Sequence, residues 1–131
     1  MNKFIALTAA ATFALGVNGS FAADAEAGAT VFKKCAACHN VEEAKNKVGP
    51  HLVNVIGRTP GTLEGFKYSN GMVAFGEGKV WDEATLTEYL ANPRGVVKGT
   101  RMAFAGLKKE EELADVIAYL KTFSEEMPKT E

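Results

Sequence analysis

The sequence predicts an all-α fold in which helices are joined by long loops. Three segments place apolar residues at the three- and four-residue steps of a helix, at about 24–34, 82–92 and 109–123. No sheet pattern is evident, and six of the thirteen glycines lie between Gly57 and Gly78. We therefore expect one helical domain with a long glycine-rich loop in its middle.

The first residues have the three-part pattern of a secretory signal peptide. Lys3 precedes an apolar run at residues 4–17, and small residues follow it. This fourteen-residue run is shorter than the about 20 residues that span a bilayer. We expect cleavage after Ala22, although a cut one or three residues later also fits. The signal peptide would be residues 1–22 and the mature domain residues 23–131.

The first predicted helix leads directly into both cysteines of the chain. Gly28, Val31, Phe32 and Cys35 share one face of it. The pentapeptide Cys35–His39 then reads C-x-x-C-H, which is the attachment signal for c-type haem. Two thiols at this spacing can form thioethers to one edge of a porphyrin, and the adjacent imidazole can bind the iron.

Two other uses of this motif remain as alternatives. A thioredoxin-like redox pair also reads C-x-x-C, but a strand within a βαβ pattern should precede it. A zinc site would need Cys35, Cys38, His39 and His51 together, and the neighbours Cys38 and His39 would have to converge on one tetrahedral ion. The spacing favours covalent haem over both.

The segment after the motif suits a chain that wraps a large cofactor. The glycines between Gly57 and Gly78, together with Pro60, predict a loop rather than a strand or a long helix. A mature domain of this size has a modest core, so a buried haem would supply much of the apolar interior. The formal net charge of −1 does not suggest nucleic-acid binding.

The second predicted helix begins at Asp82 as its N-cap and ends before Pro93. One side of it carries Leu86, Tyr89 and Leu90.

The third predicted helix spans about 109–123 and has the clearest periodicity. Its apolar residues are Leu113, Val116, Ile117 and Leu120. This stripe must pack against another element, and Gly28 offers a place where a helix could approach closely, with Tyr119 near the contact.

A haem that only exchanges electrons needs a second axial ligand on its iron. The candidates are Met72, Met102 and Met127, with His51 as the nitrogen alternative. A thioether stabilises ferrous iron and raises the potential relative to two histidines. Met102 lies in a segment without helical period, which could hold it over a ring face, so we favour it while the others stay open. If Met102 were displaced, the iron could instead serve a catalytic or sensory function.

Several motifs across the mature chain resemble those of class I c-type cytochromes, in particular the bacterial periplasmic kind close to mitochondrial cytochrome c. They are Gly28 and Phe32, Cys35, Cys38 and His39, Lys47–Pro50, Gly57–Arg58, Phe66–Ser69, Trp81, Tyr89–Leu90, Asn92–Pro93, Gly99–Met102 and Ile117–Leu120. The resemblance implies the class I cytochrome c fold, with helices and long loops wrapped around one covalently attached haem.

The resemblance also implies roles for individual residues. His39 and Met102 would ligate the iron, and Pro50 would accept a hydrogen bond from the His39 imidazole. The remaining cofactor contacts fall into two groups. Arg58, Tyr68 and Trp81 correspond to donors to the haem propionates, whereas Tyr89, Thr100 and Phe104 correspond to residues around the methionine and the exposed haem edge.

The implied function is that of an electron-transfer protein, not an enzyme: a soluble periplasmic carrier between membrane redox complexes, monomeric and docking only transiently. Its partners would be a cytochrome bc1-type complex, an oxidase, a reductase, a dehydrogenase or a photosynthetic reaction centre. A basic collar around the haem edge would steer it onto acidic partner surfaces. The collar residues here are Lys34, Lys98, Arg101, Lys108 and Lys109.

Two residues depart from the family pattern. His51 and Met72 stand where relatives often carry asparagine. A thioether cannot donate a hydrogen bond, so Met72 predicts a different polar network near the haem and a different potential.

Overall fold

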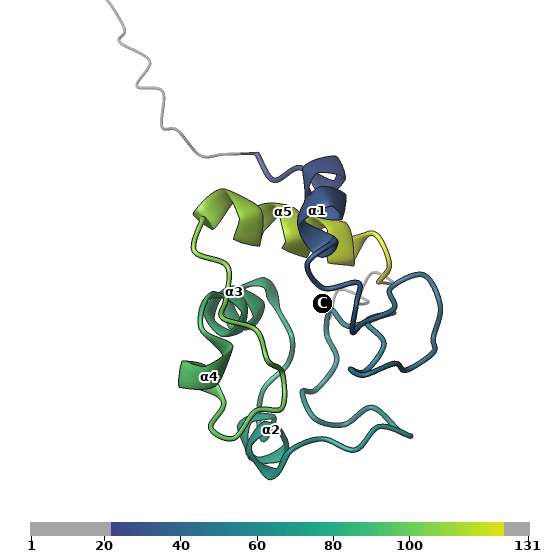
Figure 1. Cartoon of the computed structure of the whole chain (residues 1–131), viewed down its shortest axis with the longest axis vertical. Helices are drawn as coiled ribbons and strands as arrows, with labels where there is room; N and C mark the ends of the chain where they lie inside the picture. The colour runs from purple at the N-terminus through teal and green to yellow at the C-terminus, as the bar shows by residue number, and fades with distance from the viewer. Residues whose placement is uncertain (1–21, 125–131) are drawn as a thin grey trace, which may run out of the picture.

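The computed structural model describes residues 22–124, and these residues form helices and long loops without a strand. In chain order the helices are α1 (Ala25–Phe32), α2 (Asn70–Phe75), α3 (Glu83–Ala91), α4 (Pro93–Val96) and α5 (Glu110–Lys121). Figure 1 shows α1 and α5 crossing at one end of the molecule, α3 and α4 beneath α5, and α2 at the opposite end. The all-α prediction is confirmed.

The start of α1 is fixed by Asp24. Its carboxylate accepts hydrogen bonds from the backbone N–H groups of Glu26 and Ala27, at 2.9 and 3.3 Å, and so satisfies two donors that the first turn leaves unpaired. The backbone N–H of Asp24 itself donates to Oδ1 of Asp115 on α5, at 2.8 Å. The cap therefore also attaches the beginning of the domain to its last helix.

The crossing of α1 and α5 depends on Gly28. A Cβ at this position would collide with the carbonyl oxygen of Asp115 and would lie 2.8 Å from Cβ of Tyr119. Phe32, one turn further along α1, packs against the Tyr119 ring with centroids 5.4 Å apart. The predicted apolar stripe of α5 is buried beneath this contact, at Leu113, Val116, Ile117 and Leu120.

The second predicted helix is α3, and its limits are as expected. Asp82 caps it by accepting from the backbone N–H of Thr85 at 2.8 Å, and it ends just before Pro93. Leu86 and Tyr89 are buried and Leu90 is half-buried.

The two short helices, α2 and α4, were not predicted from the spacing of apolar residues. Ser69 caps α2 by accepting from the backbone N–H of Met72, and Asn92 caps α4 by accepting from that of Gly95. Neither helix is long enough to show two turns of apolar spacing, so their caps were the only signals available. The loop between Gly57 and Gly78 is therefore interrupted by α2.

The core is one cluster to which the helices and the loops both contribute. Val116, Ile117 and Val97 are at most 1 % exposed, and Val55 in the loop after the motif is 3 % exposed.

Every helix in residues 22–124 is too short or too polar to cross a bilayer.

Replacing Gly28 with alanine should destabilise the folded protein, because one added methyl group forces the two helix backbones apart. We expect a loss of about 1–3 kcal/mol in the free energy of unfolding, measured by denaturant titration of the haem-loaded protein. Thr30→Ala, at an exposed position of the same helix, is the matched control and should change stability by less than about 0.5 kcal/mol. Equal stability of the two variants would contradict the close crossing.

Candidate functional site

A cavity of about 500 Å³ lies between the turn that follows α1 and the segment that precedes α5. This volume is within the range of cofactor sites, which is roughly 300–1,000 Å³. All eleven residues predicted to contact the cofactor line it: Cys35, Cys38, His39, Pro50, Arg58, Tyr68, Trp81, Tyr89, Thr100, Met102 and Phe104. The structure thus brings together residues that are up to 69 positions apart, from Cys35 to Phe104.

The turn after α1 presents the two thiols. The backbone N–H of Cys35 donates to the carbonyl of Phe32 at 2.7 Å, and those of Cys38 and His39 donate to the carbonyl of Cys35 at 3.1 and 3.0 Å. These bonds continue the helical winding and place both sulfur atoms on the cavity wall. Both cysteines are half-buried free thiols. Burial raises the pKa of Cys35, and the neighbouring charge of Lys34 partly offsets this.

His39 is held with one ring nitrogen available. Its Nδ1 donates to the carbonyl of Pro50 at 2.7 Å, and a carbonyl can only accept, so Nε2 keeps its lone pair. Burial lowers the pKa of His39 and outweighs the carbonyl of Pro50, which raises it; Arg58 and Lys47 lower it further. The imidazole is therefore neutral and suited to bind a metal ion.

Gly49 allows this arrangement of the histidine. A Cβ at this position would lie 2.5 Å from Cε1 and 2.8 Å from Nδ1 of His39. Only a residue without a side chain lets the loop reach the imidazole closely enough for the Pro50 carbonyl to accept its proton.

Met102 lies on the segment that leads from α4 to α5. Its Sδ accepts a weak hydrogen bond from the Tyr89 hydroxyl at 3.8 Å, and that hydroxyl lies 3.4 Å from Oγ1 of Thr100. The same Oγ1 accepts from the backbone N–H of Met102 at 3.3 Å. Burial raises the pKa of Tyr89, so its hydroxyl keeps its proton. The methionine is thus positioned by a small polar network that holds both its backbone and its sulfur.

Arg58, Tyr68 and Trp81 contribute a polar part of the cavity wall. The Arg58 guanidinium donates two hydrogen bonds to the carbonyl of His51, at 3.1 and 2.9 Å, which orients it. The backbone N–H of Trp81 donates to the carbonyl of Arg58 at 2.8 Å, and the Trp81 ring packs on Tyr89 with centroids 5.1 Å apart. Burial raises the pKa of Tyr68, and the charge of Arg58 lowers it in part.

His51 does not line the cavity, so it cannot be the second ligand on the wall facing His39. Its Nδ1 is buried and makes no hydrogen bond within residues 22–124. The His51 side chain as a whole is half-buried. The zinc alternative is also wrong, because in this part of the chain no three His, Cys, Asp or Glu side chains gather as a metal site.

The other two methionine candidates differ in position. Met72, at the start of α2, lines the cavity and is half-buried, so it contributes a second thioether to the wall. Met127 lies outside the described residues, as does the apolar run of the leader.

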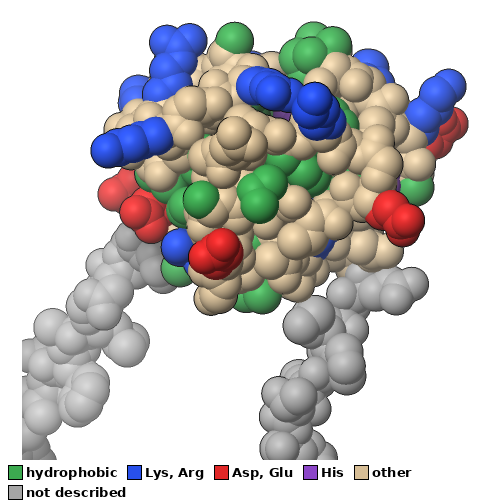
Figure 2. Space-filling view, turned by 90° about the horizontal axis from the view of Figure 1, so that it is seen from below, with side chains coloured by type: hydrophobic (Ala, Val, Ile, Leu, Met, Phe, Trp, Pro, Cys, Tyr) green, Lys and Arg blue, Asp and Glu red, His purple; other side chains and the backbone are tan. Residues whose placement is uncertain are grey.

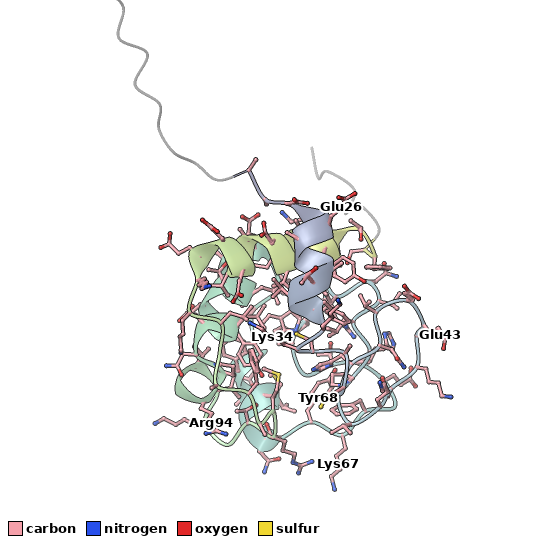
Figure 3. The ribbon with its side chains drawn as sticks, turned by 45° about the horizontal axis from the view of Figure 1, so that its top comes forward. Glu26, Lys34, Glu43, Lys67, Tyr68 and Arg94 are labelled. Carbon is pink, nitrogen blue, oxygen red and sulfur yellow. The ribbon has the colours of Figure 1, made fainter. Side chains whose placement is uncertain are left out.

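The predicted basic collar is only partly at the cavity. Lys34 and Arg101 line it, whereas Lys98, Lys108 and Lys109 do not. Lys67 lines it as well and was missed, because an exposed loop residue has no periodic signal. In Figure 3, Lys34 lies just below the end of α1 and Lys67 extends outward beside Tyr68. Figure 2, seen from the α2 side, shows Lys and Arg side chains mainly along one edge of that face.

The donor set fits a covalently attached haem. The cavity offers two free thiols, an imidazole nitrogen with a lone pair and a thioether sulfur, and its wall carries the guanidinium of Arg58. Thiols of a Cys-x-x-Cys-His motif bind haem covalently, while imidazole and thioether are axial ligands of c-type haem iron.

Comparisons with known proteins agree with this chemistry. The family model described as Cytochrome c matches residues 25–124. Cytochrome c2 of Afifella marina is 54% identical over 99 residues, covering 74% of this chain and 80% of that protein. Cytochrome c-550 of Ancylobacter novellus is also 54% identical over 99 residues, covering 74% of this chain and 92% of that protein.

Solved structures show the same fold. Cytochrome c2 from Rhodospirillum centenum matches with a TM-score of 0.73 and 43% identity, covering 78% of this chain and 99% of that one. Cytochrome cH from Methylobacterium extorquens matches with a TM-score of 0.70 and 43% identity, covering 76% of this chain and 98% of that one. The chain therefore belongs to the cytochrome c family: it is an electron-transfer protein rather than an enzyme, with a class I fold and one haem c attached covalently through Cys35 and Cys38.

Proposed function

We propose that the mature domain is a soluble periplasmic carrier whose haem iron is ligated by His39 and Met102. The observation that supports this most directly is that one cavity is lined by an imidazole with a free Nε2 and by a thioether that accepts only a weak hydrogen bond. When bound, the haem supplies a one-electron couple. The chain supplies the two ligands, and ligands that stay in place keep the structural change between redox states small.

The residues behind the ligands tune the site. The Pro50 carbonyl increases the basicity of His39 by accepting from its Nδ1, as second-layer hydrogen bonds do for metal-bound imidazoles. The Tyr89 hydroxyl donates toward the Met102 sulfur and withdraws electron density from it. These two hydrogen bonds both change the midpoint potential of the haem, and they change it in opposite directions. Phe104, half-buried at the cavity, covers the edge of the site.

Arg58, Tyr68 and Trp81 are proposed to receive the haem propionates. A buried carboxylate is costly unless it is paired and hydrogen-bonded. Arg58 is already oriented by two bonds to the His51 carbonyl, so little side-chain entropy remains to be lost when it pairs with an anion. Met72 lines the same cavity and adds no donor, so this network contains one polar group fewer than an asparagine would provide.

Docking is proposed to occur at the cavity mouth, which we define as the five exposed residues that line the cavity: Lys34, Val48, Lys67, Arg101 and Ala103. Three of them are cations and none is acidic. Such a surface favours acidic partners and fast, salt-sensitive association. The partners proposed are a cytochrome bc1-type complex together with an oxidase, a reductase, a dehydrogenase or a photosynthetic reaction centre. The carrier would be monomeric and would bind these membrane complexes transiently.

Export is proposed to remove residues 1–22. A cut after Ala22 keeps Asp24, whose carboxylate caps α1 and whose N–H bonds to Asp115, whereas a cut after Ala25 would delete both interactions. Protein purified from the periplasm of a haem-maturing host should therefore have the mass of residues 23–131 plus one haem. A mature chain that begins at Glu26 would contradict this boundary. Ala22→Leu is the control, because a large residue at the cut should block processing.

Replacing Met102 with alanine should remove the distal ligand while leaving the haem attached. We expect the midpoint potential to fall by on the order of 100 mV or more, and the reduced protein to bind carbon monoxide, because one iron position is opened. Redox titration and ligand-binding spectra measure both effects. Met72→Ala is the matched control, since it removes a second thioether from the same cavity. It should leave the iron closed to carbon monoxide; the opposite result would assign the ligand to Met72.

A further inference from the structure

The segment that carries Met102 is fixed at its two ends. We call residues 98–106 the Met102 strap. Val97, immediately before the strap, is 1% exposed, and Leu107, immediately after it, is 2% exposed. The backbone N–H of Leu107 also donates to the carbonyl of Leu90 at 2.8 Å. Both ends of the strap are therefore anchored in the core, and the position of Met102 depends on what supports the residues between them.

The backbone hydrogen bonds within the strap shape it but do not attach it to other elements. The N–H of Thr100 donates to the carbonyl of Val97 at 3.3 Å, and that of Phe104 donates to the carbonyl of Met102 at 2.9 Å. These bonds join residues at most three positions apart. The side chain of Lys98, the first residue of the strap, is exposed. Support for the strap must therefore come from a neighbouring element.

Helix α2 provides this support at Lys98. A Cβ on Gly71, the second residue of α2, would collide with the carbonyl oxygen of Lys98. It would also lie 3.0 Å from the carbonyl carbon of Lys98 and 3.5 Å from Cγ1 of Val97. In Figure 1 the segment after α4 turns beside α2 before it leads back to α5. The two backbones can touch because position 71 has no side chain.

Helix α2 is also packed against a second backbone segment. A Cβ on its C-cap residue, Gly76, would collide with the carbonyl oxygen of Pro60, and Pro60 is less than 2% exposed. A Cβ on Gly61 would lie 3.1 Å from Cα of Val73. The helix is thus backed by a buried loop, whereas Lys98 is at the surface. If a methyl group were added at position 71, the strap would be the side that gives way.

We propose that Gly71 is a positioning residue for Met102, and that its contact with Lys98 sets how readily a foreign ligand replaces the methionine on the iron. This inference rests on the proposed ligation by Met102. A methyl group at position 71 would raise the free energy of the state in which the strap is seated against α2. When a foreign ligand takes the place of Met102, the strap can move outward and this strain is released. The variant should therefore bind that ligand more tightly than the parent protein.

The test is a titration of the oxidised, haem-loaded protein with imidazole, followed by the loss of the near-infrared band that reports a methionine sulfur on ferric haem. Gly71→Ala is compared with Gly76→Ala, which places the same methyl group against a different carbonyl at the other end of α2. We expect Gly71→Ala to bind imidazole about tenfold more tightly than the parent protein, because the overpacking strain is released on binding. Gly76→Ala should stay within about twofold of the parent, because its strain is the same in both states.

A second pair of variants tests the same contact without adding a methyl group, in case Gly71→Ala does not accumulate as haem-loaded protein. Lys98→Gly frees the strap backbone where α2 supports it, whereas Lys98→Ala removes the same exposed side chain without that freedom. We expect Lys98→Gly to bind imidazole about threefold more tightly than Lys98→Ala, because the freer backbone favours the displaced strap.

The outcomes separate this inference from the proposed ligation. If the parent protein shows the near-infrared band but the two variants within either pair bind imidazole equally tightly, the positioning role of Gly71 is wrong and ligation by Met102 stands. If the parent protein lacks the band, the ligation by Met102 is itself wrong.

Discussion

The close crossing of α1 and α5 at Gly28 is the constraint on which the functional site depends. Because this crossing joins the two ends of the domain, it fixes the cysteine turn that follows α1 relative to α5 and to the Met102 segment that precedes α5. Both segments line the cavity. The middle of the chain fills the remaining sides, mostly as loops. A fold with so little regular structure can therefore bring His39 and Met102, which are far apart in the sequence, to one cavity.

Each of the two proposed ligands is supported by a different kind of hydrogen bond. A carbonyl accepts from the imidazole of His39, and a hydroxyl donates toward the sulfur of Met102. Neutral groups make both contacts: burial lowers the pKa of His39 and raises that of Tyr89, so neither side chain carries charge near neutral pH. Among the cations that line the cavity in residues 22–124, Arg58 is the one that is half-buried rather than exposed, and its guanidinium is suited to pair with an acidic group of the cofactor.

The parts of the molecule that could be predicted are those in which apolar residues repeat at helical spacing or in which a sequence motif is present. The stripe of α5 and the Asp82 cap predicted the long helices, and the motif together with the family resemblance predicted eleven of the residues that line the cavity. Helices α2 and α4 were missed because six and four residues cannot display helical spacing. Lys67 lies in a family motif but was not predicted to be one of the cations at the cavity, because its position there depends on how the loops meet. The unpartnered Nδ1 of His51 likewise depends on tertiary packing.

We propose that His39 and Met102 together ligate the haem iron in the native protein. The direct test is the absorption spectrum of the oxidised, haem-loaded wild-type protein at neutral pH. A methionine sulfur on ferric haem gives a weak near-infrared band, and we expect to see that band. Its absence from properly matured protein would mean that Met102 faces the cavity without binding the iron, and the proposed ligation would be wrong.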